Sequence, residues 1–149
     1  MPKASIKRLI ECKKKDLIEL VLDIEKYPDF IPFCHAAKIH EKKDDNDFIN
    51  IIADLTIGKG PFKDTYKSDV LFNKNEGSII VKNIEGPLNH LSNNWSFKEN
   101  KSITEVTFDI DFEIKNKFLN TMMTASFQFG MEKIADAFQR RAEELFGNS

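Results

Sequence analysis

The strongest constraint on the fold is an alternating segment near the C-terminus that is followed directly by a long amphipathic one. Within residues 105–114 apolar residues alternate with polar or charged ones, a pattern typical of a strand with one buried face. The apolar positions are Val106, Phe108, Ile110, Phe112 and Ile114. Residues 117–145 then repeat apolar residues at steps of three and four, which predicts one long helix between an N-cap at Asn116 and a stop at Gly147. The two patterns together predict a helix packed against a sheet.

The rest of the chain predicts further strands, joined by short breaks, and one more helix. Residues 5–12 are expected to form a first strand and residues 16–24 a first helix with one apolar face. Alternating segments follow at 49–57, 62–72 and 91–99. They are separated by glycine- and asparagine-rich breaks at residues 58–61, 73–77 and 86–87. Short strands joined in this way predict an antiparallel sheet with one solvent-exposed face, within an α+β fold.

This element order predicts a helix-grip architecture, in which a curved antiparallel sheet wraps around the long C-terminal helix. Because such a sheet cannot close fully against one helix, a hydrophobic cavity is expected between them. No internal repeat and no Pro/Gly/Ser-rich linker divides the sequence, so residues 1–149 are interpreted as a single domain. A chain of this length can bury a sufficient core without a disulfide or a metal.

Charge and cysteine content narrow the class of protein. The 22 basic and 24 acidic residues give a net charge of −2, which argues against nucleic-acid binding by overall charge but not against a local basic patch. Cys12 and Cys34 form no C-x-x-C pattern, so a reducing compartment is expected. The N-terminal residues lack the apolar region of a secretory signal, and no apolar run is long enough to span a bilayer.

No sequence pattern indicates catalysis or metal binding. His35, His40 and His90 lie in three separate segments, and neither H-E-x-x-H nor G-x-S-x-G occurs. We therefore predict no catalytic residue, no metal site and no required cofactor.

The first half of the predicted terminal helix carries two apolar stripes. The first faces the sheet, and its adaptable or large side chains Met123, Phe127 and Met131 are candidates for cavity lining. The second lies about 120° away on the helix surface, where a solvated helix needs no apolar residues. It consists of Phe118, Met122, Ala125 and Phe129. Either the proline-rich loop of residues 27–34 covers this stripe, or the stripe is a patch for a membrane surface, a lipid ligand or a second subunit.

Polar residues are also expected on the inner face of the sheet. Asp64, Tyr66 and Ser68 alternate on the same face as apolar residues of the 62–72 strand. Arg8 is expected on the inner face of the first strand, within reach of an acidic partner such as Asp64. Buried polar groups need partners, so these residues form either a structural polar network or contacts to the head group of an apolar ligand.

Four segments, which together span most of the chain, resemble one known family. Residues 27–34 (YPDFIPFC) are similar to a Y-P-x-F-x-P-W-C signature, and residues 62–70 (FKDTYKSDV) to F-x-E-x-Y-x-S-x-V. Residues 86–97 (GPLNHLSNNWSF) are similar to G-P-F-x-x-L-x-N-x-W-x-F, and residues 138–147 (FQRRAEELFG) to an A-F-E-x-R-A-x-x-L-Y-G ending. The family is the coenzyme Q-binding, START-like group, which also contains the bacterial ribosome-association toxin. Two departures are conservative: Phe33 replaces a tryptophan, with loss of its N–H donor, and Asp64 replaces a glutamate.

The resemblance implies a START/Bet v 1-like helix-grip fold that holds ubiquinone, a polyisoprenoid quinone, and supports its delivery or function in respiration without catalysis. The quinone tail would lie between the sheet and the terminal helix. The quinone oxygens would lie near Tyr66 and Ser68. The expected cavity residues are Tyr66, Ser68, Trp95, Phe108, Phe112, Met123, Phe127 and Met131. The expected cavity mouth and membrane contact comprise Phe30, Pro32, Phe33, Phe118, Met122 and Phe129. The expected location is cytoplasmic and peripheral to the bacterial inner membrane, or the mitochondrial matrix side in a eukaryote.

Two alternative functions follow from the same resemblance and fold. A ribosome-binding factor that blocks subunit association would contact the large ribosomal subunit through a basic surface, which Lys63, Lys67 and residues 13–15 would supply. An enzyme of the polyketide aromatase/cyclase kind would fold a reactive chain with its cavity side chains alone. The absence of an acid–base pattern makes the enzyme the least favoured of the three.

Overall fold

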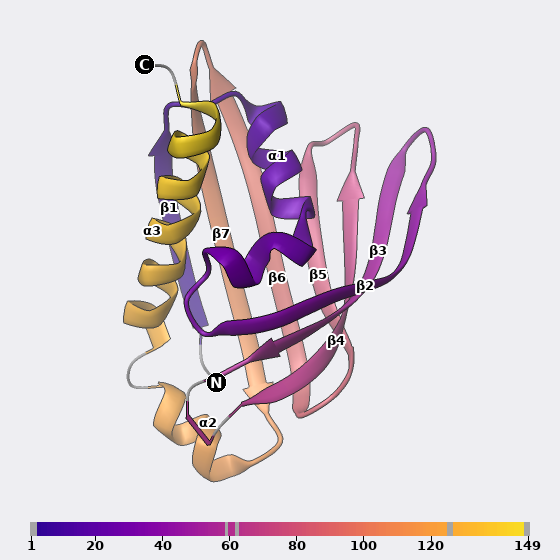
Figure 1. The fold of residues 1–149 in the computed structure, drawn as a ribbon, viewed down its shortest axis with the longest axis vertical. Helices are drawn as coiled ribbons and strands as arrows, with labels where there is room; N and C mark the ends of the chain where they lie inside the picture. The colour runs from indigo at the N-terminus through magenta and orange to yellow at the C-terminus, as the bar shows by residue number, and fades with distance from the viewer. Residues whose placement is uncertain (1–2, 59, 62, 125–126, 148–149) are drawn as a thin grey trace.

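The protein folds into one curved sheet with helices on its inner face (Figure 1). The computed structural model describes residues 3–58, 60–61, 63–124 and 127–147, without the side chains of Leu119, Met122 and Met123. The strands are β1 (Lys3–Ile10), β2 (Cys34–Asp44), β3 (Phe48–Ile57), β4 (Asp64–Asn73), β5 (Ser78–Glu85), β6 (Leu88–Asn100) and β7 (Ile103–Ile114). The helices are α1 (Lys14–Leu22), the short 3-10 helix η1 (Ile24–Asp29), α2 (Lys117–Thr124) and α3 (Phe127–Phe146).

All neighbouring strands of the seven-stranded sheet are antiparallel, in the order β1-β7-β6-β5-β4-β3-β2. The first strand thus pairs with the last, and β2 forms the far edge. The predicted alternation of β7 is confirmed, because Val106 and Phe112 are buried whereas Asp109, on the other face, is exposed. In this register Trp95 of β6 lies beside Phe108 of β7, both on the inner face. The α+β class with a curved antiparallel sheet is therefore confirmed.

The helices cover different parts of the inner face. In Figure 1, α3 runs alongside β1 and β7, while α1 lies in front of the middle strands. Helix α1 buries four apolar residues, Leu17, Ile18, Leu20 and Val21. The η1 turn packs below it, where the Tyr27 hydroxyl donates a hydrogen bond to the backbone carbonyl of Val21. The short helix η1 therefore extends into the start of the proline-rich loop of residues 27–34.

The prediction of one helix over residues 117–145 is wrong. Two helices, α2 and α3, occupy this segment, and α2 lies beyond the end of the sheet while α3 follows β1 (Figure 1). The apolar steps continue through the segment, and no glycine or proline stands between the two helices. The hydroxyls of Thr121 and Thr124 donate to the carbonyl oxygens four residues earlier, a pattern that bends helices. The predicted end at Gly147 agrees with the last residue of α3, Phe146.

Strand β2 is not predicted by the sequence pattern. Most residues of this strand are polar and exposed, so no alternation reveals it. The strand lies at the edge of the sheet, and two irregularities shift its register with β3. Edge strands commonly carry charges and bulges, which discourage pairing with another chain.

Candidate functional site

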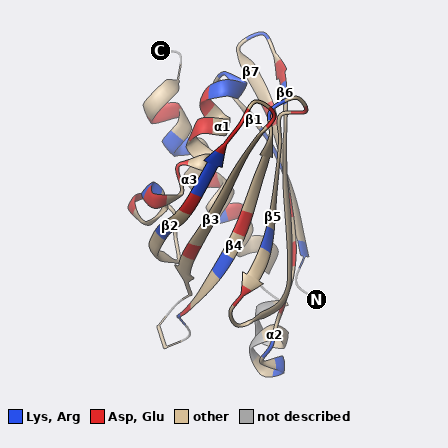
Figure 2. Cartoon of the chain, turned by 90° about the vertical axis from the view of Figure 1, so that its right-hand side faces the viewer, with Lys and Arg blue, Asp and Glu red and all other residues tan. Residues whose placement is uncertain are grey.

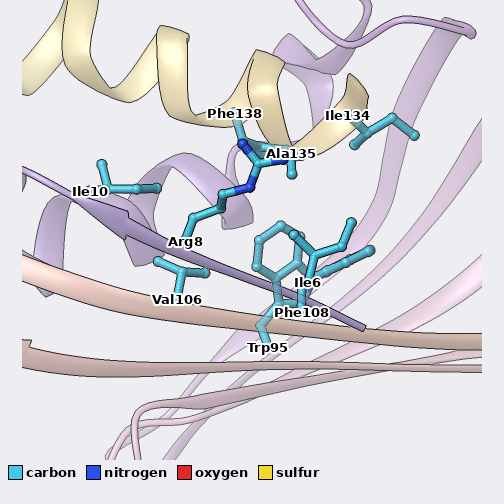
Figure 3. A pocket seen from close by; sticks show the side chains of 9 residues that line it. All are labelled: Ile6, Arg8, Ile10, Trp95, Val106, Phe108, Ile134, Ala135 and Phe138. Atoms are coloured by element: carbon cyan, nitrogen blue, oxygen red, sulfur yellow. The ribbon is translucent and has the colours of Figure 1, made fainter. Parts of the chain in front are cut away.

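The structure contains a small apolar pocket between the sheet and α3 (Figure 3). Three neighbouring strands, β1, β6 and β7, form its floor, and α3 forms its roof. Its lining residues are Ile6, Arg8, Ile10, Trp95, Val106, Phe108, Ile134, Ala135 and Phe138. The pocket holds about 30 Å³, whereas pockets for drug-sized ligands hold about 300–1,000 Å³. A lipid-sized ligand therefore requires α3 or its side chains to move.

Aromatic rings define one wall of this pocket. The ring centroids of Trp95 and Phe108 are 4.6 Å apart, and those of Trp95 and Phe138 are 5.2 Å apart. The Trp95 indole Nε1 donates a 3.1 Å hydrogen bond to Oδ1 of Asn93. Because the polar atom of the indole has this partner, the ring presents only apolar surface to the pocket.

Among the described residues that line the pocket, Arg8 is the only charged one. Its side chain extends from β1 toward α3 (Figure 3), where Nη1 lies 2.5 Å from Oδ1 of Asp136. Its Nη2 also donates to the backbone carbonyl of Glu132 at 3.4 Å. The expected pairing with Asp64 is thus wrong, because β4 is four strands away from β1 in the sheet. Asp64 is exposed and accepts a hydrogen bond from the backbone N–H of Thr65.

The two polar residues expected near a head group lie deeper in the sheet. Ser68 is fully buried, and its hydroxyl donates to the carbonyl oxygen of Ala53 at 3.3 Å. Tyr66 packs against both hydrophobic clusters of the protein. Burial raises the pKa of its phenol above the ordinary value, so the group is neutral at physiological pH. Neither residue lines the pocket as it stands, and their contact with a ligand stays a prediction.

The remaining predicted cavity residues form a second cluster near the start of α3. The ring centroids of Phe112 and Phe127 are 4.7 Å apart, and Met131 packs against the same cluster. Of the predicted cavity residues, Trp95 and Phe108 therefore line the pocket, while these three belong to the second cluster. The side chain of Met123 lies outside the described residues.

The residues predicted for the cavity mouth separate into two groups. Phe30 is half-buried, with its ring centroid 5.3 Å from that of Phe138, and Pro32 is also half-buried. Phe118 and Phe129 are instead 69% and 63% exposed, and Phe33 is 38% exposed. The proline-rich loop therefore does not cover Phe118 and Phe129, contrary to one of the two interpretations of this stripe. The side chain of Met122 lies outside the described residues.

Sequence reasoning did not assign six of the described lining residues to the cavity, which are Ile6, Ile10, Val106, Ile134, Ala135 and Phe138. A signal for part of this set is present in the sequence, because Ile134 and Phe138 continue the stripe of Met131 by steps of three and four residues.

The lysines proposed as a basic surface lie apart. Residues 13–15 lie at the start of α1, at the end of the sheet that carries the β6–β7 turn. There the backbone N–H of Lys14 donates a hydrogen bond to the carboxylate of Glu99. Lys67 belongs to β4, which begins at the opposite end (Figure 1). Its ammonium forms a 2.9 Å ion pair with Glu85, and this hydrogen bond raises the pKa of Lys67. Basic and acidic residues are interspersed on the visible strands in Figure 2.

The described part of the chain was considered for two further features, a metal site and a membrane-spanning helix. No group of three or more His, Cys, Asp or Glu side chains there is arranged to hold a metal ion. No helix among the described residues is long and apolar enough to cross a membrane.

Comparisons with known proteins agree on the fold and on the relatives. Residues 13–139 match the sequence profile of the polyketide cyclase / dehydrase and lipid transport family. The ribosome association toxin RatA of Rickettsia prowazekii is 30% identical over 93% of this chain and 94% of its own length. The mitochondrial coenzyme Q-binding protein COQ10 of Dictyostelium discoideum is 31% identical over 87% of this chain and 63% of its own. The solution structure of an 18 kDa protein from Caulobacter crescentus superposes with a TM-score of 0.80 at 26% identity, over 97% of this chain and 98% of that one.

Proposed function

The chain belongs to the polyketide cyclase / dehydrase and lipid transport family, and from this premise we propose that it binds ubiquinone between the sheet and α3 and carries it without catalysing a reaction. The observation that carries the proposal is the apolar pocket beneath α3, with aromatic rings on its wall and one charged group at its edge. An isoprenoid tail matches such a lining. The similarity to a protein named for coenzyme Q binding supports this choice of ligand.

The ligand requires more room than the closed pocket offers. We propose that α3 moves outward to admit it. Of the two C-terminal helices, α3 contributes the described residues that line the pocket. The side chains of Phe127 and Met131, which belong to the second cluster with Tyr66 packed against it, would then face the enlarged cavity.

The exposed aromatic residues at the same end of the molecule suit a lipid surface. Residues 115–131 contain no aspartate or glutamate but include Lys115 and Lys117. Lys133 lies over the exposed ring of Phe129, 4.7 Å from its centroid. Exposed aromatic residues flanked by lysines are typical of proteins that bind the interface of anionic membranes. The proposed site of action is therefore the surface of the respiratory membrane, in contact with Phe118 and Phe129.

A vesicle assay tests both parts of this proposal. The protein is expected to move ubiquinone from donor to acceptor vesicles that contain anionic lipid, and the rate should fall at least fivefold in Phe118→Glu. Leu9→Glu is the matched control, because Leu9 is 64% exposed on β1 outside this surface. Equal rates with and without protein would contradict the carrier function. Equal rates in Phe118→Glu and the wild type would contradict the membrane contact. If the wild-type protein is a dimer and Phe118→Glu is a monomer, the surface is instead an interface with a second copy of the chain.

The second candidate function is binding to the large ribosomal subunit. The observation that favours it is the similarity to RatA over nearly the whole of both chains. The separation of the lysines and the ion pair of Lys67 count against a continuous basic surface. Co-sedimentation with large subunits that decreases steeply with salt would favour this function over ubiquinone transport.

An enzyme remains the third and least favoured candidate, although the family description includes cyclases and dehydrases. The lining that the structure describes contains one ionisable residue, Arg8. General acid–base catalysis generally relies on a group that can exchange a proton near neutral pH, which a guanidinium cannot do.

A further inference from the structure

We infer that Arg8 binds the oxygen-bearing head of the apolar ligand, and that Asp136 occupies this position in the empty protein. This inference rests on the proposed function, because it requires an apolar ligand beneath α3. Beyond that function, the inference assigns to Arg8 the discrimination between ligands. It also identifies the Arg8–Asp136 ion pair as the contact that ligand binding must replace.

The first argument is the position of Arg8 in the pocket. The residue lies on the inner face of β1 between Ile6 and Ile10, which both line the pocket. Its guanidinium reaches the edge of α3 (Figure 3), and its side chain is 29% exposed. A ligand whose tail lies against Trp95 would therefore present its head to Arg8 at the boundary between the apolar interior and solvent.

The second argument is the chemistry of the present partner. A guanidinium carries only hydrogen-bond donors, so it recognises oxygen acceptors such as carboxylates and carbonyls. In this structure the acceptors are Oδ1 of Asp136 and the backbone oxygen of Glu132. Both belong to α3, which is the element that must move to admit a ligand. The same movement would separate Arg8 from these acceptors and leave its N–H groups free for an acceptor on the ligand.

The third argument is the modest strength of the contact to be replaced. The side chain of Asp136 is 52% exposed, and ion pairs of this exposure contribute little to stability. A ligand can therefore displace Asp136, whereas a buried and fully desolvated pair would resist displacement. The predicted ligand class is an apolar molecule with a terminal oxygen acceptor, either the carbonyl of a quinone or the carboxylate of a fatty acid.

Binding measurements with three probes test the inference. The probes are ubiquinone with a short isoprenoid tail, palmitate, and squalene as a hydrocarbon without an acceptor. Arg8→Met should weaken the binding of at least one oxygen-bearing probe about tenfold or more, because hydrogen bonds to charged groups are worth about 1.5–3 kcal/mol. Binding of squalene should not change. The probe that loses affinity identifies the head group as a carbonyl or a carboxylate.

The substitution Asp136→Asn is expected to change ligand affinity in the opposite direction. Weakening the competing acceptor should raise the affinity for the same probe about two- to fivefold. Glu105→Gln is the matched control, because it alters the Lys7–Glu105 pair on the outer face of β1 and should leave binding unchanged. Arg8→Lys, which retains the charge, keeps the test valid if Arg8→Met does not fold, and it should give a smaller loss.

The two proposals fail in different ways. If none of the three probes binds the wild-type protein, the proposed function is contradicted, and this inference with it. If all the probes bind but neither Arg8 variant nor Asp136→Asn changes their affinity, the assignment of Arg8 alone is overturned.

Discussion

Replacing Phe138 by alanine is expected to lower the free energy of unfolding by about 3–5 kcal/mol. The Phe138 ring lies at the centre of the core, with ring centroids 5.5 Å from Tyr27, 5.3 Å from Phe30 and 5.2 Å from Trp95. Its loss would remove three edge-on ring contacts that join α3 to η1 and β6, and would leave a cavity there. Thermal or urea unfolding of the purified variant measures the effect.

Phe129→Ala is the control for this prediction. The same substitution on the same helix removes a ring that is 63% exposed, so the free energy of unfolding should change by about 0.5 kcal/mol or less. Equal losses in the two variants would show that Phe138 does not have the central packing role described above.

Gly86→Ala is expected to cost about 2–6 kcal/mol in the free energy of unfolding. Gly86 has φ of +132°, a conformation in which a side chain adds about 1–3 kcal/mol of strain. A methyl group at this position would lie 2.9 Å from the backbone Cα of Tyr66, and relieving such overpacking costs about 1–3 kcal/mol more. The substitution should therefore also displace Tyr66, which links the two hydrophobic clusters.

Gly60→Ala separates strain from crowding. Gly60 also has a positive φ, of +60°, but a methyl group there would have no atom within 4 Å. Its expected cost is about 1–2 kcal/mol, the ordinary penalty for a left-handed residue. Urea unfolding that gives equal losses for the two variants would contradict the close approach between Gly86 and Tyr66.

Much of the fold could be predicted because its signals are local. The alternation of Val106 to Ile114 identified β7 and its buried face, since a one-residue shift would expose every apolar side chain. The presence of two helices, α2 and α3, could not be predicted from hydrophobic periodicity, because the apolar steps continue from one to the other. The exposed edge strand β2 was missed because neither of its faces is largely buried.

The site was harder to predict, because its geometry depends on which strands are neighbours. Arg8 was correctly placed on the inner face, but its partner was assigned to β4 instead of α3. Strand order decided between these partners, and the alternation of a strand carries no information about its neighbours. Trp95 and Phe108 were expected in the cavity and line the pocket, whereas the position of the void beside Ala135 depends on how α3 packs.

The most direct test of the central claim is mass spectrometry of an organic extract from the protein purified out of a quinone-containing bacterium. We predict ubiquinone at a near-stoichiometric amount, and its loss in Ala135→Leu, whose larger side chain would fill the roof of the pocket. A folded wild-type protein that carries no quinone, and takes up none when ubiquinone is added, would contradict the claim.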